Sequence, residues 1–218
     1  MSMTKEMTSG KPYKLILSFA IPLILGNVFQ QLYNMVDTVI VGKFVGVNAL
    51  AGVGSTGAIN FLVIGFALGI CSGFSIMIAQ RFGAGDYSGM RKFIANSIYL
   101  CIAVAVILTA VTMLLTKPIL TVMNTPKEIY DYAYNYIIII FAGISATMFY
   151  NILSGILRAV GDSRTPLIFL GVSSVLNVGL DLLCIIVFKM GVAGAGIATV
   201  ISQAISCLLY TSDAADDK

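Results

Sequence analysis

Two acidic residues stand alone inside long apolar stretches of this 218-residue sequence, and their chemistry is the first clue to a function. Asp37 and Asp181 are the only charged side chains well inside such stretches. A carboxylate at the centre of a membrane helix costs about 2.5–3.5 kcal/mol on insertion scales, so its presence there indicates a functional role by default. Carboxylates exchange protons and bind hard cations such as Na⁺. A structural role, in which each carboxylate holds helices together by hydrogen bonds, stays open.

Asp37 ends a series of polar side chains along one face of its segment. The other members are amides three to ten positions earlier: Asn27, Gln30, Gln31 and Asn34. In a helix these side chains and Asp37 fall within an arc of about 120°, or about 80° when Gln31 is left aside. The opposite face carries Val, Leu, Ile and Phe. The pattern predicts one wall of a water-filled cavity, and an interhelical ladder of hydrogen bonds is the alternative.

Asp181 repeats this pattern in a later segment. Asn177 and Ser174 precede it by four and seven residues, which places all three on one helix face. Thr199 in the next segment can add a hydroxyl group. Two carboxylates, an amide and a hydroxyl form an oxygen-rich set that suits a proton or Na⁺.

The segments that must position these residues are long and apolar. Hydrophobic residues make up 58% of the sequence and charged residues 11%, against about 25% charged in a typical soluble domain, which excludes a water-soluble domain. Six segments are long enough to cross a bilayer core of ~30 Å at ~1.5 Å per residue: 15–41, 49–80, 93–115, 132–153, 166–188 and 191–210. Because backbone groups in lipid must bond internally, we expect an all-α membrane protein, a six-transmembrane-helix bundle.

Composition argues against two other classes of function. The net charge is only +3 and basic runs are absent, so we expect membrane lipid and no nucleic acid as a partner. The sequence has no His and no evident pairing of a nucleophile with a base, so we expect no enzyme. Its four Cys are far apart, which disfavours a zinc site. No cofactor is expected beyond a coupling ion.

The Lys and Arg between the segments predict the orientation. Eight of them fall on the side of the N-terminus and four on the other side, so the positive-inside rule puts the N-terminal segment 1–14 in the cytoplasm. We expect a multi-pass protein of the plasma (inner) membrane. Residues 211–218 are acidic after an apolar helix, and we interpret them as a truncation point or foreign tail.

Three further local patterns lead to structural expectations. Pro22 lies inside the first segment and bends it, either as a hinge or as a static kink. Asp86 and Asp162 follow similar Arg- and Gly-containing stretches and are expected to cap helices. Alternating tyrosines open the fourth segment and are expected to form an interfacial aromatic belt: Tyr130, Tyr132, Tyr134 and Tyr136.

The order and spacing of short motifs resemble the multidrug and toxic compound extrusion (MATE) transporters. The similarity extends over nearly the whole chain to about residue 210. The motifs that carry it are Ile21-Pro22, Gln30-Gln31-Leu32-Tyr33-Asn34, Val36-Asp37-Thr38, Val41-Gly42, Gly46, Ala49-Leu50-Ala51-Gly52-Val53-Gly54, Gly83-Ala84-Gly85-Asp86 and Gly161-Asp162-Ser163-Arg164-Thr165-Pro166.

The resemblance implies a twelve-helix fold of two six-helix lobes, of which this chain is the N-terminal lobe without its C-terminal partner. It implies the export of organic, often cationic, drugs or metabolites in exchange for Na⁺ or H⁺. By the match, Asp37 is the cation-coupling carboxylate of the first helix. The other members of the implied cation or proton site, where Na⁺ can bind, are Asn177, Asp181 and Thr199.

Two hypotheses from other classes stay open. A lipid-linked saccharide flippase of a related fold would line its cavity with cations to hold a pyrophosphate, and no Lys or Arg lies deep in a segment here. A non-transporting membrane interaction protein would use the two Asp as links between helices.

Overall fold

The apolar segments form helices throughout the part of the chain that the structure describes. The computed structural model describes the backbone of residues 11–216 and the side chains of residues 11 and 13–210, so residues 1–10 of the predicted N-terminal segment and the side chains of the acidic tail lie outside it. No strand occurs within residues 11–216. The helices are α1 (Pro12–Phe44), α2 (Val47–Ser55), α3 (Gly57–Gly83), α4 (Tyr87–Val122), α5 (Lys127–Ala142), α6 (Ile144–Ala159), α7 (Arg164–Leu182), the π-helix η1 (Leu183–Val187) and α8 (Val192–Asp216).

Five of these helices are long and apolar enough to cross a membrane, and α5 with α6 makes a sixth span. These two helices meet at Gly143 with a bend of 48°. A side chain at Gly143 would collide with Val200 of α8, so the glycine lets α8 pack against the bend. The chain is therefore a bundle of six membrane spans and a multi-pass membrane protein.

The segment 49–80, expected as one span, is broken near its start. Thr56 separates the short α2 from α3, and its hydroxyl donates a hydrogen bond to the carbonyl of Val53 at 2.7 Å. The short α2 packs against α5 so closely that a Cβ atom at Gly52 would come within 2.6 Å of Tyr132 Cβ. Only α3 is then a full-length span of this segment.

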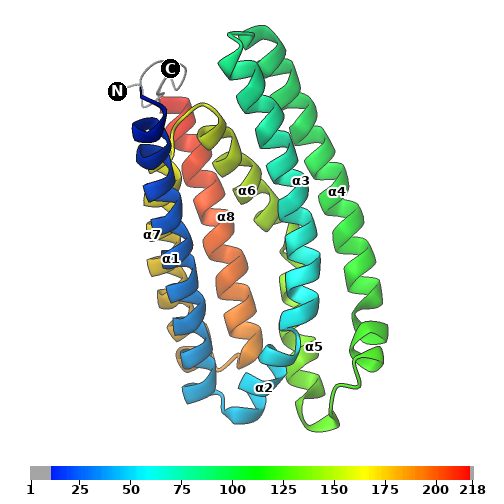
Figure 1. Cartoon of the computed structure of the whole chain (residues 1–218). Coiled ribbons are helices and arrows are strands. Elements are labelled where there is room, and N and C mark those ends of the chain that lie inside the picture. The colour runs from blue at the N-terminus through cyan, green and yellow to red at the C-terminus, as the bar shows by residue number, and fades with distance from the viewer. Residues whose placement is uncertain (1–10, 217–218) are drawn as a thin grey trace.

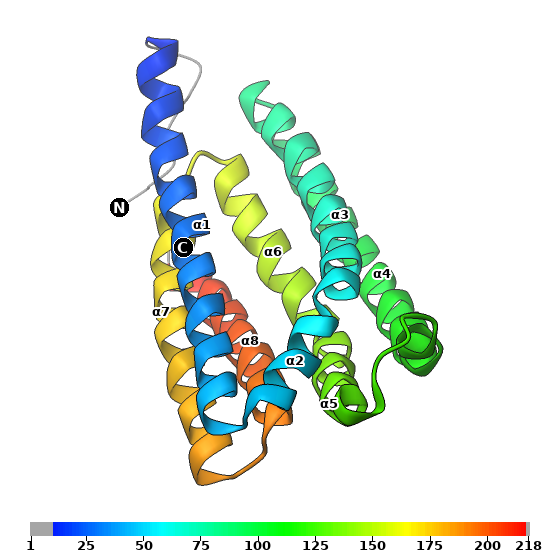
Figure 2. The same cartoon turned by 60° about the horizontal axis from the view of Figure 1, so that its bottom comes forward.

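The helices are arranged as two groups joined by α8. Figures 1 and 2 show α1 beside α7 and α3 beside α4, with α6 and α8 between these pairs. One buried apolar cluster lies among α3, α4, α5 and α6, and a second lies where α1, α2, α5 and α8 meet. Many large side chains on the outside are exposed, among them Phe61 at 83% and Leu114 at 78%, as expected for surfaces that contact lipid.

Arginines gather at one end of the bundle. α1 begins and α8 ends at this end, and the turns between α3 and α4 and between α6 and α7 also lie there (Figure 1). Arg81, Arg158 and Arg164 belong to these turns. The opposite end carries Lys43 and Lys189.

Both expected aspartate caps are present at the first end. Asp86 accepts a hydrogen bond from the backbone N–H of Gly89 at 2.8 Å and forms an ion pair with Arg81 at 2.8 Å. Hydrogen bonds from Gly89 and Arg81 hold the pKa of the Asp86 carboxyl below its usual range. Asp162 accepts from the backbone N–H groups of Arg164 and Thr165, at 2.9 and 3.1 Å, and so caps α7.

Candidate functional site

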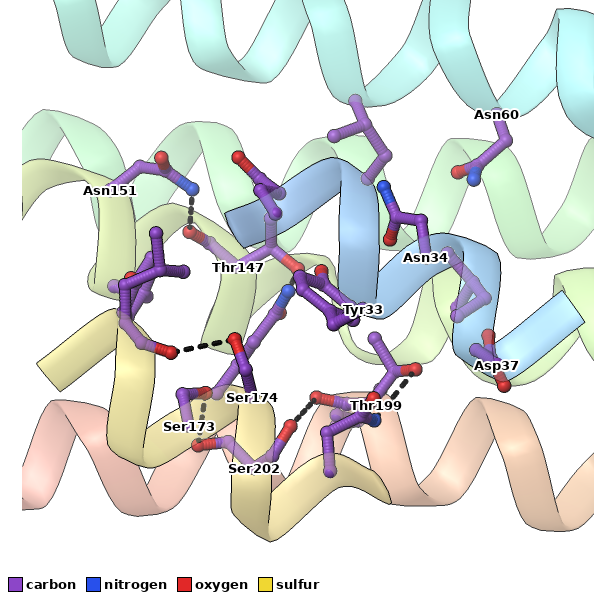
Figure 3. Close-up of a pocket in the computed structure, with 18 of the residues that line it drawn as sticks. Tyr33, Asn34, Asp37, Asn60, Thr147, Asn151, Ser173, Ser174, Thr199 and Ser202 are labelled. Atoms are coloured by element: carbon purple, nitrogen blue, oxygen red, sulfur yellow. Dashed lines mark hydrogen bonds between the residues drawn. The ribbon is translucent and has the colours of Figure 1, made fainter. Parts of the chain in front are cut away.

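A polar cavity of about 190 Å³ opens between the two groups of helices. Its walls come from α1, α3, α5, α6, α7 and α8, and Figure 3 shows their polar side chains pointing toward one another. The polar lining residues are Gln30, Tyr33, Asn34, Asp37, Asn60, Tyr136, Thr147, Tyr150, Asn151, Ser173, Ser174, Asn177, Thr199, Ser202 and Gln203. The lining contains one carboxylate, Asp37, and no Lys or Arg.

The two intramembrane carboxyl groups come together at the edge of this cavity. Asp37 on α1 lines the cavity and is 9% exposed, whereas Asp181 on α7 is fully buried and lies behind it. Their carboxyl groups lie close enough together to interact electrostatically. Ionised carboxylates only accept hydrogen bonds, so two of them can be linked only by a shared proton or by a cation between them.

The neighbouring amide and hydroxyl complete an oxygen-rich group. Asn177, one turn before Asp181, donates a hydrogen bond to Thr199 Oγ1 at 3.4 Å. The Thr199 hydroxyl in turn donates to the carbonyl of Ala195 at 3.1 Å. Asn177 Oδ1, Asp37 Oδ1 and both carboxyl oxygens of Asp181 are buried and accept no hydrogen bond from any described residue.

These unpaired oxygens fit a hard cation or a proton. Buried oxygens without donors are costly, and a cation that takes oxygen ligands satisfies several of them at once. A transition-metal site fits less well, because no group of three His, Cys, Asp or Glu side chains occurs among the described residues. The oxygens of Asp37, Asn177, Asp181 and Thr199 are chemically able to hold Na⁺ or a proton.

The π-helix η1 begins two residues after Asp181. It bonds with a wider turn than an α-helix, and such turns occur frequently at functional sites. No feature of the sequence predicted this change of helix type.

The polar face of α1 is divided between two cavities. Gln30 and Asn34 line the main cavity, and Asn27 lines a smaller adjoining one. Gln31 lines neither of these two cavities, and its role as a cavity residue stays a prediction. It lies at the edge of the polar arc, where its side chain is exposed and accepts a hydrogen bond from Asn34 at 3.4 Å.

The smaller cavity has a volume of about 60 Å³ and lies between α1, α6 and α7. It shares four lining residues with the main cavity: Gln30, Tyr150, Asn151 and Leu170. Pro22, the predicted bend of α1, contributes to its wall, as does Arg158 at the end of α6.

Several cavity residues were missed because they are small polar groups scattered through otherwise apolar segments, with no charged residue to draw attention to them. Thr147 of α6 donates a hydrogen bond to Gln203 Oε1 of α8 at 2.6 Å. Ser173 of α7 donates to the carbonyl of Ser202 at 3.3 Å. Tyr136, expected in an interfacial belt, is instead buried and lines the cavity. Single polar residues at non-adjacent positions gave no periodic pattern that would group them.

The chain is a helical membrane bundle with an internal polar cavity, and sequence comparison identifies its family. The MatE family matches residues 22–183. The chain therefore belongs to the MATE family.

Curated relatives agree with this assignment. The chain is 34% identical over 203 residues to "Probable multidrug resistance protein YpnP" of Bacillus subtilis, covering 93% of the chain and 46% of that protein. It is 33% identical over 202 residues to "Probable multidrug resistance protein NorM" of Thermotoga maritima, covering 91% and 43%. The chain thus spans about half the length of the curated relatives it matches.

Solved structures share its architecture. The outward-facing conformation of a multidrug resistance MATE family transporter superposes with a TM-score of 0.89 at 30% identity, over 96% of this chain and 46% of that one. A transporter of the MOP superfamily from Pyrococcus furiosus, described as having a binding pocket of reverse polarity, gives a TM-score of 0.90 at 30% identity with the same coverage. The fold is that of one lobe of a twelve-helix MATE transporter.

Proposed function

We propose that this chain is the ion-coupling N-terminal lobe of an antiporter that exports organic, often cationic, compounds in exchange for Na⁺ or H⁺. The observation that carries the proposal is the pairing of Asp37 and Asp181 beside the polar cavity. Their unpaired oxygens provide sites for a proton or Na⁺. The multidrug names of the relatives support an exported drug or metabolite as cargo.

Competition for the same negative charge explains how exchange would work. Asp37 faces the cavity, so its negative charge attracts a cationic compound that is held there. A proton or Na⁺ on the carboxyl pair cancels that charge and weakens the hold on the compound. Exchange follows if the ion binds one arrangement of the lobe better than the other. Pro22 in α1 is the natural place for the two arrangements to differ, because the proline removes an internal helix hydrogen bond.

The complete transporter would need a second lobe to close the cavity. Asn27, Gln30 and Asn34 are exposed on α1, and an exposed polar face is unfavourable against lipid. A C-terminal lobe, as in the twelve-helix relatives, would cover this face. The Arg-rich end of the bundle supports an inner-membrane orientation with the N-terminus in the cytoplasm.

The cavity lining favours this function over lipid-linked saccharide flipping. A pyrophosphate needs cations around it, and the main cavity has one carboxylate and no Lys or Arg among its lining residues. A purely structural role for the carboxyls would leave their unpaired oxygens unexplained.

Dye efflux tests the proposal. The chain is expressed alone and joined to the C-terminal half of the Bacillus relative, in cells that lack their own exporters, and ethidium efflux is followed with and without Na⁺ and a proton gradient. We expect Asp37→Asn to abolish ion-driven efflux, and Gln31→Ala to leave it unchanged. Wild-type efflux by the Asp37→Asn protein would contradict the coupling role.

A further inference from the structure

The smaller cavity has a lining of opposite character on its two sides. Its α6 wall is polar and carries Tyr150, Asn151, Ser154 and Arg158. Its α7 wall is apolar and carries Pro166, Leu167 and Leu170, while its α1 wall is mixed, with Pro22 and Leu23 beside Asn27 and Gln30. This division suits a ligand with a polar group and an attached apolar part.

Arg158 is the charged group of this cavity. Its side chain is half-buried in the last turn of α6, and it forms no ion pair or hydrogen bond with any described side chain. The nearby carboxylate of Asp162 is occupied by the N–H groups of α7 and does not line the cavity. A guanidinium has five donors and no acceptor, so only an anion or other acceptors can satisfy it.

The position of Arg158 indicates where that anion comes from. The last turn of a membrane-crossing helix lies near the depth of the lipid headgroups. Next to the apolar wall, Ile21 of α1 and Ile168 of α7 are 53% and 58% exposed. Acyl chains of a lipid would find an apolar surface there. An organic cation, by contrast, would be repelled by Arg158.

The size of the cavity restricts which part of a lipid enters it. About 60 Å³ holds roughly four to six water-sized groups, which is comparable to one phosphate group. Ser163 lines the same cavity, is buried and makes no cap hydrogen bond at the start of α7, so its hydroxyl is available to a phosphate oxygen.

We propose that this cavity binds the phosphate group of a membrane phospholipid, with Arg158 as its charged donor, Ser163 as a hydroxyl donor, and the acyl chains lying along α1 and α7. The site is distinct from the carboxyl pair and independent of the proposed export function.

Native mass spectrometry of the purified full chain tests this site. The probe is dioleoylphosphatidylglycerol, and dioleoylglycerol and inorganic phosphate are the comparison ligands. The variant is Arg158→Gln, and the matched control is Arg164→Gln, because Arg164 lies at the same end of the bundle and is exposed without lining the cavity.

We expect one tightly bound phosphatidylglycerol on the wild-type chain and on the Arg164→Gln variant. The Arg158→Gln variant should bind phosphatidylglycerol with an affinity about tenfold lower, as expected for the loss of a charge-assisted hydrogen bond. Dioleoylglycerol should not be retained. Equal losses in both variants, equal retention of dioleoylglycerol, or displacement of the lipid by millimolar phosphate would each overturn the proposal. If Arg158→Gln does not fold, Arg158→Lys and Ser163→Ala are measured instead, and unchanged lipid affinity in both would also overturn it.

Discussion

Asp37 on α1 and Asp181 on α7 bring their carboxyl groups close enough together to interact electrostatically at the edge of a polar cavity. Three of their four oxygens are buried without a hydrogen-bond donor among the described residues. Two such groups repel each other when both are ionised, and the repulsion is stronger in a low-dielectric interior than in water. The pair is therefore poised to take up a positive charge.

Replacing one carboxyl of the pair with an amide should stabilise the protein when no cation is bound. We expect Asp181→Asn to raise the melting temperature by about 2–4 °C in Na⁺-free alkaline buffer, which corresponds to about 1 kcal/mol for a chain of this size. The amide removes a charge and can donate a hydrogen bond to Asp37. Thermal unfolding in detergent measures the effect, and a lower melting temperature under these conditions would mean that the carboxyls do not repel each other.

Thr199 distinguishes Na⁺ from a proton as the coupling ion. A hydroxyl oxygen can bind Na⁺, whereas a proton needs only the carboxyl pair. We expect Thr199→Val to lower Na⁺ affinity about five- to tenfold, as for the loss of one oxygen ligand. Calorimetric Na⁺ titration measures it. Ser202→Ala is the control, because Ser202 donates to the carbonyl of Thr199 and its own hydroxyl lies outside the oxygen group. Equal losses in the two variants would contradict a specific role for Thr199.

Gln30 and Gln31 are adjacent and chemically identical, which makes them a matched pair. Gln30 lines both cavities and Gln31 lines neither. We expect Gln30→Ala to weaken ethidium binding about fivefold, as for the loss of one hydrogen bond, and Gln31→Ala to leave it unchanged. Fluorescence titration of the purified chain gives both values. Equal effects of the two substitutions would show that the cavity does not hold the dye.

The contact between α2 and α5 leaves no room for a methyl group at Gly52. A Cβ atom there would meet Tyr132 Cβ at 2.6 Å, the backbone N of Ala133 at 3.0 Å and the carbonyl of Ile129 at 3.1 Å. Backbone atoms cannot relieve a clash by changing rotamer as a side chain can. We therefore expect Gly52→Ala to destabilise the protein by about 1–3 kcal/mol. Gly54→Ala in the same helix meets nothing within 4 Å and should be neutral or slightly stabilising. Denaturant unfolding in micelles would contradict this account if it ranked the two variants in the opposite order.

The cap at the start of α4 should weaken in acid. Hydrogen bonds from Gly89 and Arg81 lower the pKa of Asp86, so the folded state favours the ionised carboxyl. The stabilisation is present above the usual aspartate pKa of about 3.9 and is lost as the pH falls through the lower folded-state value. We expect hydrogen exchange at the first turn of α4 to be faster in Asp86→Ala than in wild type at pH 6, with the difference shrinking toward pH 3. A difference that does not depend on pH would contradict this role of the charge.

The sequence predicted the fold class and the polar face of α1 because each rests on a local, periodic pattern. Asp37, Gln30 and Asn34 repeat at helical spacing, so their shared face follows from the chain itself. Asp37 and Asp181 come together because α1 packs against α7. This contact leaves no repeating pattern in the sequence that could predict it. Thr199 was grouped with them from its chemistry alone, as a hydroxyl in the next segment, and the family resemblance implied the same set.

Other features arise from packing at single residues. The break at Thr56 involves no proline, and its hydroxyl bonds within the turn. The run Gly54-Ser55-Thr56-Gly57 is a turn signal that was passed over because the segment around it is long and apolar. The bend at Gly143 exists because α8 packs against a position without a side chain. Gln31 lies outside both cavities because a polar arc of about 120° is wider than the part of α1 that faces them. Tertiary contacts of this kind decide which member of an arc is used.

Infrared difference spectroscopy of the purified chain tests the central claim most directly, because carboxyl bands report protonation and cation binding alike. The account predicts that adding H⁺ or Na⁺ changes carboxyl bands in the wild-type chain, and that this change is lost in both Asp37→Asn and Asp181→Asn. Bands that respond to neither ion, or a response that survives in both variants, would contradict a cation-binding carboxyl pair.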